Sequence, residues 1–366
     1  MQMKKRVAVL CGGKSTEHEV SLLSARNIVQ ALDRTNYEPI LIGIGKDGVW
    51  RLYEDFSFLL SGKNPKEIAL PSDGKDVVFV SGGSGKLVRL STTKEEMMMD
   101  VVFPILHGPC GEDGTVQGLL ELAGVPFVGA GVCGAAVGMD KDVMKRLLRD
   151  AGIPIGRFLT LHRNMTESFS SIAKELGSPF FIKPARAGSS VGVHKVKNER
   201  NFGVAVADAF RYDTKIIAEG YIAGREIECA VLGNDELFAS VPGEIIVHHE
   251  FYSYEAKYMD ANGATMDIPA KISPSITEEV RSLARKTFEV LGCEGMGRVD
   301  FFLREDGTLF VNEINVLPGF TAISMYPKLL AASGISQSEL IDRLIQLACD
   351  RFAQEEKLAT SYQEPT

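Results

Sequence analysis

The sequence lacks several features that would place it in a specialised class of protein. Its six cysteines are scattered and form no CxxC pair, so we predict buried, reduced thiols rather than a metal-binding or disulfide framework. No apolar run approaches the eighteen or so residues of a membrane span. An excess of basic residues is also absent. The formal net charge of -8 argues against a nucleic-acid partner.

The N-terminal segment MQMKKRVAVLCGG has a basic start but only five apolar residues before its glycine pair, which is too few for a signal peptide. With no membrane span predicted either, we expect a cytoplasmic protein without a membrane partner. The chain has 366 residues, of which 45% are hydrophobic and 24% are charged. This is long enough for two or three globular domains, each with a core of its own.

Strands and helices alternate in the first part of the chain. An apolar strand over residues 6–13 leads into a helix, for which Thr16 and Glu19 have the spacing of a capping box, and a second strand follows near Glu38. This β-α-β order predicts a parallel sheet. The segment 48–100 is less regular. We predict an α/β and α+β fold with a Rossmann-like parallel-sheet domain at the N-terminus. The three predicted domains are residues 1–137, 138–224 and 225–366.

The Asp-Gly pair at 306–307 separates two apolar runs and predicts a hairpin with a two-residue turn. That register places Asp300 opposite Glu313 and Arg298 opposite Asn315, all on one face of the ribbon. Opposed carboxylates repel each other unless a cation lies between them, and an all-oxygen set suits Mg²⁺ or Mn²⁺. The alternatives are a solvated ribbon face with unrelated acids, or a register shifted by one residue.

Two glycine-rich loops add candidate ligand groups. GSSVG at 188–192 lies between two predicted strands, and its small residues let backbone N–H groups approach an anion, with Lys183 nearby. Taken alone, this loop is read more simply as a tight turn. Together with the opposed acids it favours nucleotide binding. HGPCGEDG places His107, Glu112 and Asp113 at the carboxyl end of a strand, where ligands bind in open α/β sheets.

AVLCGGKS, which ends at Ser15, has the loose spacing of a Walker A motif, but its first residues belong to the strand and leave too little loop to wrap a phosphate. A P-loop NTPase would place phosphates on Lys14. A non-catalytic amino-acid-binding module is another possible class, although it has no use for opposed acids beside lysines and a phosphate-type loop.

Read together, these motifs resemble a known family. From GGKSTEHEVS to NEINVLPGFT the chain is similar to the D-alanine–D-alanine ligases of the ATP-grasp superfamily, and most of all to their longer bacterial form. The motifs that carry the resemblance are HGPCGEDGTVQG, FIKPARAGSSVGV, EGYIAGREIE, FYSYEAKY, GRVDFFL and NEINVLPGF. Val316 departs from the family pattern, in which a small hydroxyl residue is common. The resemblance implies a three-domain ATP-grasp fold that holds ATP between the central and C-terminal domains.

The resemblance also implies the reaction. ATP would phosphorylate the carboxylate of one D-alanine, and the amine of a second D-alanine would attack the acyl phosphate and release phosphate. The product would be a precursor of bacterial peptidoglycan, and the enzyme a homodimer. A ligase that joins D-alanine to D-lactate or D-serine is the alternative. Family members that use D-lactate commonly carry phenylalanine where this chain has Tyr258, so Tyr258 points to D-alanine as the acceptor.

ATP and two Mg²⁺ ions, which Mn²⁺ can replace, are implied together with their ligands. The implied metal ligands are Asp300, Glu313 and Asn315. The implied ATP ligands are Lys141, Lys183, Ser190, Glu219, Glu226 and Lys257. The lysines would contact the phosphates, and the two glutamates the adenine and ribose. The metal ions would cancel charge on the phosphates.

The amino-acid end of the site is implied in the same way. Glu17 would hold the ammonium of the first D-alanine and connect through Ser189 to Tyr258. The oxyanion site would be Arg298 with the backbone N–H of Gly319. The residues implied for the amino-acid pocket are His107, Ser324 and Met325. The stretch 250–269 is polar yet rich in tyrosine, and we expect it to act as a lid over bound ligand.

Overall fold

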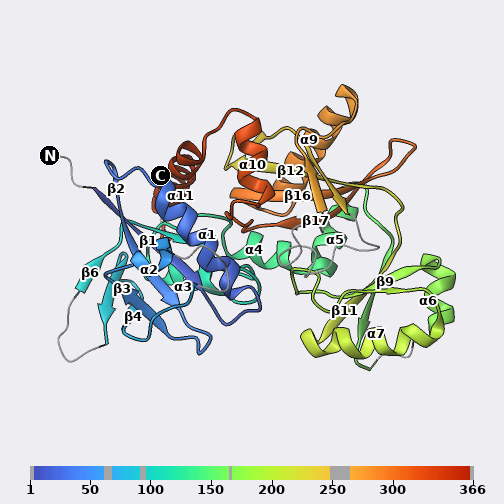
Figure 1. The fold of residues 1–366 in the computed structure, drawn as a ribbon, viewed down its shortest axis with the longest axis horizontal. Coiled ribbons are helices and arrows are strands. Elements are labelled where there is room, and N and C mark those ends of the chain that lie inside the picture. Colours follow the sequence, from blue (N-terminus) through green and yellow to red (C-terminus); the bar gives the residue numbers. More distant parts are fainter. Residues whose placement is uncertain (1–3, 62–67, 91–95, 165–166, 248–263, 363–366) are drawn as a thin grey trace.

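The computed structural model describes residues 4–61, 68–90, 96–164, 167–247 and 264–362, which form three sheets (Figure 1). The first sheet has the strand order β6-β5-β4-β3-β2-β1-β7. Its strands are β1 (Lys5–Gly12), β2 (Tyr37–Ile44), β3 (Trp50–Tyr53), β4 (Lys75–Phe79), β5 (Lys86–Arg89), β6 (Glu96–Met98) and β7 (Val101–Pro104). The predicted parallel pairing is found where β1 meets β2 and β7. The segment predicted to be irregular instead extends this sheet with antiparallel strands, so the sheet is mixed.

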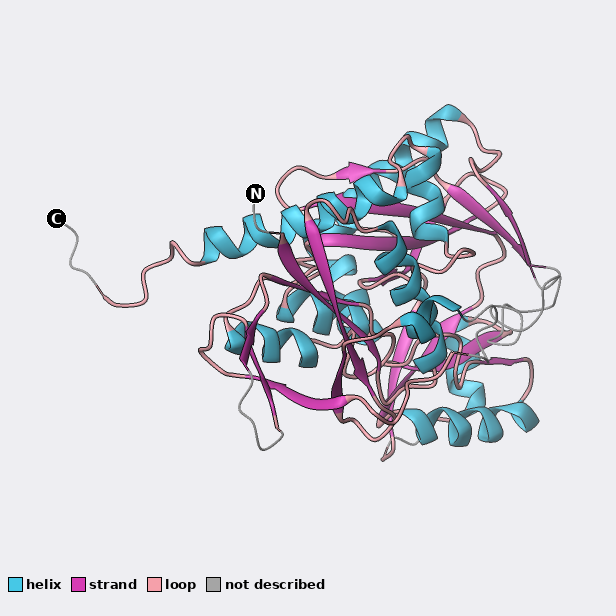
Figure 2. Ribbon diagram, turned by 60° about the vertical axis from the view of Figure 1, so that its left-hand side comes forward, coloured by secondary structure: helices cyan, strands magenta, loops and turns pink. Residues whose placement is uncertain are grey.

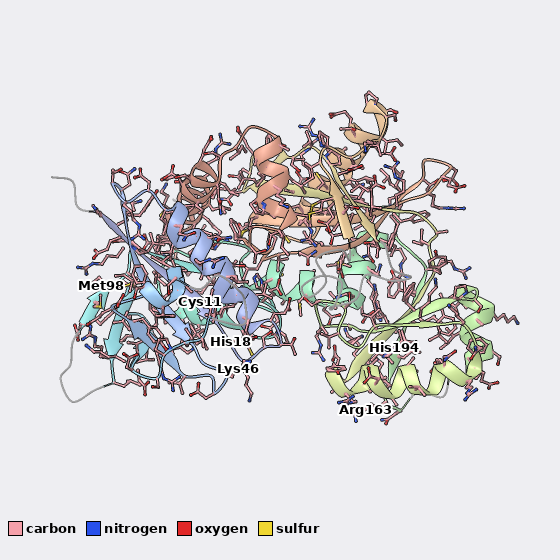
Figure 3. The ribbon with its side chains drawn as sticks, in the orientation of Figure 1. Cys11, His18, Lys46, Met98, Arg163 and His194 are labelled. Atoms are coloured by element: carbon pink, nitrogen blue, oxygen red, sulfur yellow. The ribbon has the colours of Figure 1, made fainter. Side chains whose placement is uncertain are left out.

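The helices associated with the first sheet are α1 (His18–Ala31), α2 (Ser57–Ser61) and α3 (Thr115–Ala123). The predicted capping box at the start of α1 is wrong. Glu17 precedes the helix without a side-chain cap, and Glu19 instead pairs with Lys46 at 2.7 Å. His18 Nδ1 lies 2.8 Å from the carbonyl oxygen of Gly13, which ties the first turn of α1 to the end of β1 (Figure 3). The start of α1 is therefore held by contacts with Gly13 and Lys46.

The second sheet is antiparallel, with the order β10-β9-β11-β8. Its strands are β8 (Phe158–His162), β9 (Phe180–Pro184), β10 (His194–Val196) and β11 (Lys215–Gly220), and its helices are α6 (Phe169–Leu176) and α7 (Glu199–Tyr212). Ile172 of α6 and Ala205 of α7 pack on its strands in a small separate core. Arg163 and His194 mark this sheet in Figure 3, well apart from Cys11 in the first sheet.

The third sheet is antiparallel, with the order β15-β14-β12-β16-β17 and a short β13 that pairs with β12. Its strands are β12 (Arg225–Gly233), β13 (Phe238–Ala239), β14 (Gly243–Val247), β15 (Ala264–Asp267), β16 (Gly295–Leu303) and β17 (Leu309–Asn315). Its helices are α4 (Val132–Met139), α5 (Lys141–Asp150), α9 (Pro274–Val290), α10 (Met325–Ala332) and α11 (Gln337–Glu355). Figure 2 shows the C-terminal end of α11 projecting from the body of the molecule.

Both faces of β12 are buried, as expected for a strand that is covered by helices on two sides. Ile227 and Cys229 face the core that contains α5 and α9, whereas Ala230 and Leu232 join the core that contains α1, α10 and α11. The first and third sheets therefore share one hydrophobic core. The domain boundaries at residues 137 and 224 stay a prediction. No helix within the described ranges has the length and apolar character to cross a membrane.

Candidate active site

A cavity of about 550 Å³ lies where the three sheets meet. Its lining includes all the described residues whose roles the family resemblance implied. These residues are Glu17, His107, Lys141, Lys183, Ser189, Ser190, Glu219, Glu226, Arg298, Asp300, Glu313, Asn315, Gly319, Ser324 and Met325. The predicted residues Lys257 and Tyr258, and most of the predicted lid, lie outside the described residues. Lys14 is not part of the lining.

The hairpin of β16 and β17 has the predicted register at the site, with Asp300 paired to Glu313. The turn, however, is not a two-residue turn. The backbone N–H of Arg304 donates to the carbonyl oxygen of Thr308 at 3.0 Å, which leaves three residues in the loop. That loop alone would slip the strands by one residue. A β-bulge opposite Asp300 adds Asn312 to β17 and restores the register.

Asp300 is held by neighbours on the same face. Arg298 Nε and Nη2 donate to its two carboxylate oxygens at 2.8 Å each, and Asn315 Nδ2 donates at 2.9 Å. Arg298 Nε also lies 2.8 Å from a carboxylate oxygen of Glu228. Burial acts to lower the pKa of Arg298, but Asp300 and Glu228 outweigh it and hold that pKa well above its ordinary value. Arg298 is therefore a fixed cation at the cavity floor.

The same face offers oxygen donors that fit a hard divalent cation. No cluster of three or more His, Cys, Asp or Glu side chains is arranged for a metal within the described ranges. Two carboxylates with one amide nevertheless suit Mg²⁺, which takes few protein ligands and completes its shell with water and phosphate oxygens. Glu313 lies 3.4 Å from Lys141 Nζ. Positive side chains thus lie beside both acids.

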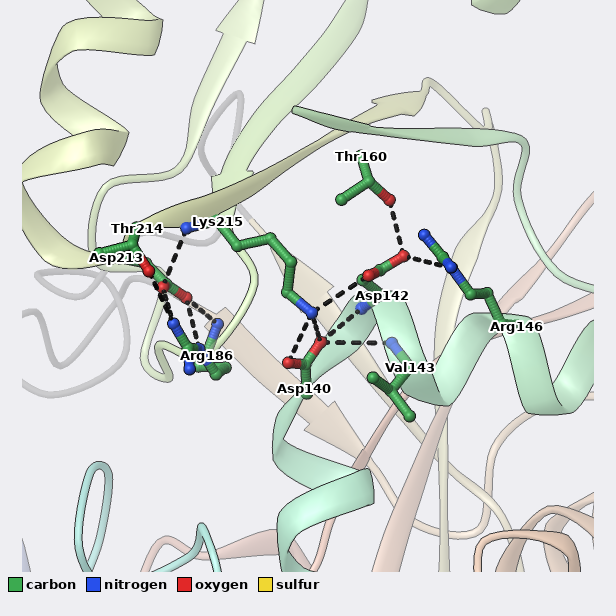
Figure 4. A network of polar contacts seen from close by, with 9 residues as sticks. All are labelled: Asp140, Asp142, Val143, Arg146, Thr160, Arg186, Asp213, Thr214 and Lys215. Carbon is green, nitrogen blue, oxygen red and sulfur yellow. Dashed lines mark hydrogen bonds and ion pairs between the residues drawn. The ribbon is translucent and has the colours of Figure 1, made fainter. Parts of the chain in front are cut away.

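Lys141 reaches the cavity from the first turn of α5. Asp140 caps the helix, and its side chain accepts from the backbone N–H of Asp142 and Val143 at 3.2 Å. Lys215 of β11 lies 2.7 Å from Asp140 and 3.1 Å from Asp142 (Figure 4). These acids offset the unfavourable placement of a lysine at a helix N-terminus. The network pins the start of α5 to the second sheet.

The GSSVG loop closes over the cavity from the second sheet. Its approach is fixed by Asp213, which accepts from the backbone N–H of Arg186 at 2.8 Å and pairs with its guanidinium (Figure 4). Ser189 and Ser190 adopt left-handed φ angles of 50° and 59°. Such angles are uncommon for residues other than glycine and often mark functional loops. Ser189 Oγ donates to the Glu17 carboxylate, as the family resemblance implied.

Two lysines share the carboxylate of Glu219. Lys145 Nζ lies 2.5 Å from one oxygen, and Lys183 Nζ contacts the other. Burial acts to raise the pKa of Glu219, but the two ammonium groups outweigh it and lower that pKa. Sequence reasoning missed Lys145, although its spacing of four residues from Lys141 places both lysines on one face of α5. Glu228 was also missed. It follows Glu226 by two residues, the spacing of side chains on the same face of a strand.

At the amino-acid end, α1 contacts the loop that follows β17. Ser24 Oγ lies 3.3 Å from His107 Nε2 and accepts from the backbone N–H of Phe320 at 3.2 Å. Burial lowers the pKa of His107 more than Glu17 raises it, so the imidazole is neutral at physiological pH. A Cβ atom at Gly319 would lie 2.8 Å from Ser324 Oγ. A larger residue at this position would therefore displace the Ser324 hydroxyl.

The loop between β7 and α3 brings Glu112 into the cavity wall. The backbone N–H of Gly108 donates to Glu112 Oε2 at 2.6 Å. Burial, and then the nearby Glu17 charge, raise the pKa of Glu112 to about 8. Asp113 instead folds the loop, because its carboxylate accepts from the backbone N–H of Cys110 at 2.9 Å. Of these two acids, Glu112 is the one that faces the ligand space.

Two family models together match most of the chain. The model described as D-ala D-ala ligase N-terminus matches residues 6–130, and the one described as D-ala D-ala ligase C-terminus matches residues 147–346. The chain belongs to the D-alanine–D-alanine ligase family. A D-alanine–D-alanine ligase from Oceanobacillus iheyensis is 49% identical over 98% of this chain and 99% of its own length. D-alanine–D-alanine ligase A of Escherichia coli K12 is 48% identical over 98% of this chain and 99% of its own length.

Solved structures of the ligase family share the fold. A D-alanine–D-alanine ligase from Coxiella burnetii superposes with a TM-score of 0.87 at 40% identity, over 97% of each chain. The VanG D-Ala:D-Ser ligase from Enterococcus faecalis superposes with a TM-score of 0.84 at 36% identity, over 94% of this chain and all of its own. The predicted three-domain ATP-grasp fold and the predicted resemblance are thereby confirmed.

Proposed function

We propose that this protein is an ATP-dependent ligase that joins two D-alanines into D-alanyl-D-alanine, with release of ADP and phosphate. The observation that carries the proposal is that phosphate-type lysines, an opposed acid pair and an amino-acid pocket line one cavity. The dipeptide would serve bacterial peptidoglycan synthesis. A cytoplasmic location and a homodimer stay predictions of the sequence.

The first step transfers the γ-phosphoryl group of ATP to a carboxylate oxygen of the first D-alanine, giving ADP and an acyl phosphate. Lys141 and Lys183 would bind phosphate oxygens, and the backbone of the Ser189–Ser190 loop would lie over them. Glu219 and Glu226 would orient the adenine and ribose ends. Mg²⁺ held by Asp300, Glu313 and Asn315 would supply positive charge to the phosphates.

In the second step the amine nitrogen of the second D-alanine attacks the acyl carbon. A C–N bond forms, the C–O bond to phosphate breaks, and the nitrogen loses a proton. The oxyanion of the tetrahedral intermediate would receive hydrogen bonds from Arg298 and the backbone N–H of Gly319, which are fixed before the reaction begins. Glu17 would hold the first ammonium, and His107 would shape the pocket. Ser324 and the backbone at Met325 would bind the second carboxylate.

A second candidate is a D-alanine–D-serine ligase, because the structure of VanG covers 94% of this chain with a TM-score of 0.84. The deciding experiment measures phosphate release with Mg²⁺-ATP and D-alanine, L-alanine, D-serine or D-lactate as acceptor, and identifies the product by mass. We expect D-alanyl-D-alanine to dominate. A mixed product with D-serine in excess would select the second candidate, and no phosphate release with any D-amino acid would overturn both.

A further inference from the structure

We propose that Lys145, which lies behind the cavity wall rather than in it, is a positioning residue for ATP. Its ammonium group holds two parts of the wall together: the Glu219 carboxylate on β11 and the bulge at Asn312 on β17. This inference rests on the proposed function, because it gives Lys145 a role in the ATP site of that reaction.

The contacts of Lys145 join two sheets. Its side chain is fully buried, with 0% exposure. Nζ lies 2.5 Å from Glu219 Oε1 in the second sheet and donates to the backbone carbonyl oxygen of Asn312 at 3.2 Å in the third. Asn312 is the extra residue of the bulge that sets Glu313 opposite Asp300. One ammonium group therefore fixes the distance between the predicted adenine end and the predicted metal end of the site.

Packing alone does not explain a lysine at this position. The other buried positions of α5 are the charged Lys141 and Asp142 and the apolar Met144 and Leu148, so an apolar side chain at position 145 would still have buried apolar neighbours on the helix. Burying an ammonium group carries a desolvation penalty that good partners only partly offset, and apolar replacements are often as stable or more so. A charge retained here is consistent with a requirement of the site rather than of the fold.

The two lysines on Glu219 have different surroundings. Lys183 lines the cavity and Lys145 does not. If Lys183 turns to an ATP phosphate, Glu219 loses one of its two cations and keeps the other. Lys145 would then hold the carboxylate in the orientation that receives the adenine. This division of roles predicts that Lys145 affects nucleotide binding without touching the nucleotide.

The test replaces Lys145 with methionine, which keeps most of the volume and removes the charge. We expect the Kd of ATP, measured by calorimetry without D-alanine, and the KM for ATP to rise about tenfold, the loss of roughly one charge-assisted hydrogen bond. The KM for D-alanine should change less than about threefold, because Lys145 Nζ contacts Glu219 and Asn312 rather than the residues implied for the amino-acid pocket.

Arg351→Met is the matched control. Arg351 is also a buried cation that joins segments: its guanidinium donates to the carbonyl oxygens of Gly129 at 2.6 Å and Phe127 at 3.0 Å, and lies 3.2 Å from Glu294. It does not line the cavity. We expect this variant to lose thermal stability while both KM values stay at wild-type levels. A buried cation with a purely structural role should behave in this way.

Each outcome decides the proposal. An unchanged ATP Kd in folded Lys145→Met, with a stability loss like that of the control, would overturn the role of Lys145. If Lys145→Met does not fold, Lys145→Gln is measured in the same way. If neither variant folds, Lys145 is needed for folding rather than for positioning ATP, and the proposal is also overturned. Wild-type protein that binds no ATP would instead remove the proposed function itself.

Discussion

Each carboxylate of the metal-type hairpin face has a cation of its own in the structure. Arg298 contacts Asp300 and Lys141 lies near Glu313. From the sequence, the two acids were expected to repel each other in the empty site, so that neutralising one would leave stability equal or slightly higher. The ion pairs change that expectation, because removing the Glu313 charge also removes a partner of Lys141.

Glu313→Gln should therefore lower turnover roughly 100-fold and raise the Mg²⁺ concentration that half-saturates activity, since the proposed metal ligand loses its charge. Stability should change by less than about 1 kcal/mol, because one partly exposed ion pair contributes little. Steady-state assays across Mg²⁺ concentrations and thermal unfolding measure both effects. Glu305→Gln, an exposed site on the same hairpin, is the control and should match wild type. Normal activity of Glu313→Gln would mean that this face of the hairpin is a solvated surface that binds no metal ion.

Glu112 predicts a pH effect on stability. Its folded pKa of about 8 lies above its ordinary value of 4.5, so the native state binds a proton that the unfolded chain has released between these pH values. Stability contributed by this group is therefore present at low pH and is lost as pH rises toward 8.

Glu112→Gln lacks that titration, so its melting temperature relative to wild type should increase from pH 5 to about pH 8 and then level off. Melting curves of the two proteins across this range measure the difference. A constant difference at every pH would show that Glu112 titrates at an ordinary value.

At the scale of elements, the N-terminus of α5 depends on a lysine from another sheet. Lys215→Met would leave Asp140 and Asp142 facing each other without their shared cation. We expect the free energy of unfolding to fall by about 1–3 kcal/mol, which is less than the loss expected when a fully buried ion pair is broken. The KM for ATP should rise several-fold, because Lys141 lies between Asp140 and Asp142 in the sequence and depends on the same helix start for its position. Denaturant unfolding and initial rates test this.

Lys271→Met is the control for that variant. Lys271 pairs with Asp267 at the same distance of 2.7 Å, but its side chain is 80% exposed. Its loss should leave unfolding and the KM for ATP unchanged. Equal effects from the two substitutions would mean that the Lys215 network does no more than an exposed ion pair.

The hairpin shows both the reach and the limit of sequence reasoning about elements. Alternation of side chains along two strands was enough to place Asp300 opposite Glu313. The turn that justified this register was nevertheless mispredicted, and the bulge at Asn312 corrected the slip. The burial of β17 breaks its alternation at the bulge, where Asn312 and Glu313 both lie between the buried Val311 and Ile314. The capping box of α1 failed because contacts from Lys46 and Gly13 outweighed a local signal.

At the scale of the whole molecule, the motifs led to a group of the described residues that line the cavity, because most of that group lie in loops or strands with a recognisable pattern. Lys145 and Ser24 were missed for a common reason. Their partners Glu219 and Phe320 lie far away in the chain, and only the folded arrangement brings them together. Residues that hold a site in place from behind carry no local signature of ligand binding.

Because the cavity lies where the three sheets meet, ligands should stabilise the whole chain. Mg²⁺-ATP at about 100 times its Kd should stabilise the native state by about 2.7 kcal/mol. D-alanine added with it should raise the melting temperature further, whereas L-alanine should not. Differential scanning fluorimetry measures these shifts. No shift with Mg²⁺-ATP would contradict the proposed nucleotide site.

The division of the hydrophobic cores has a further consequence, for amide hydrogen exchange. The second sheet is packed on its own small core, whereas the first and third sheets share a larger one. Sub-global opening reactions follow such boundaries. Amides of β9 and β11 should therefore exchange together, through an opening that leaves β1, β12 and β16 protected. Bound Mg²⁺-ATP should slow that opening by linking Lys183 to the third sheet, so nucleotide would protect amides that it never touches.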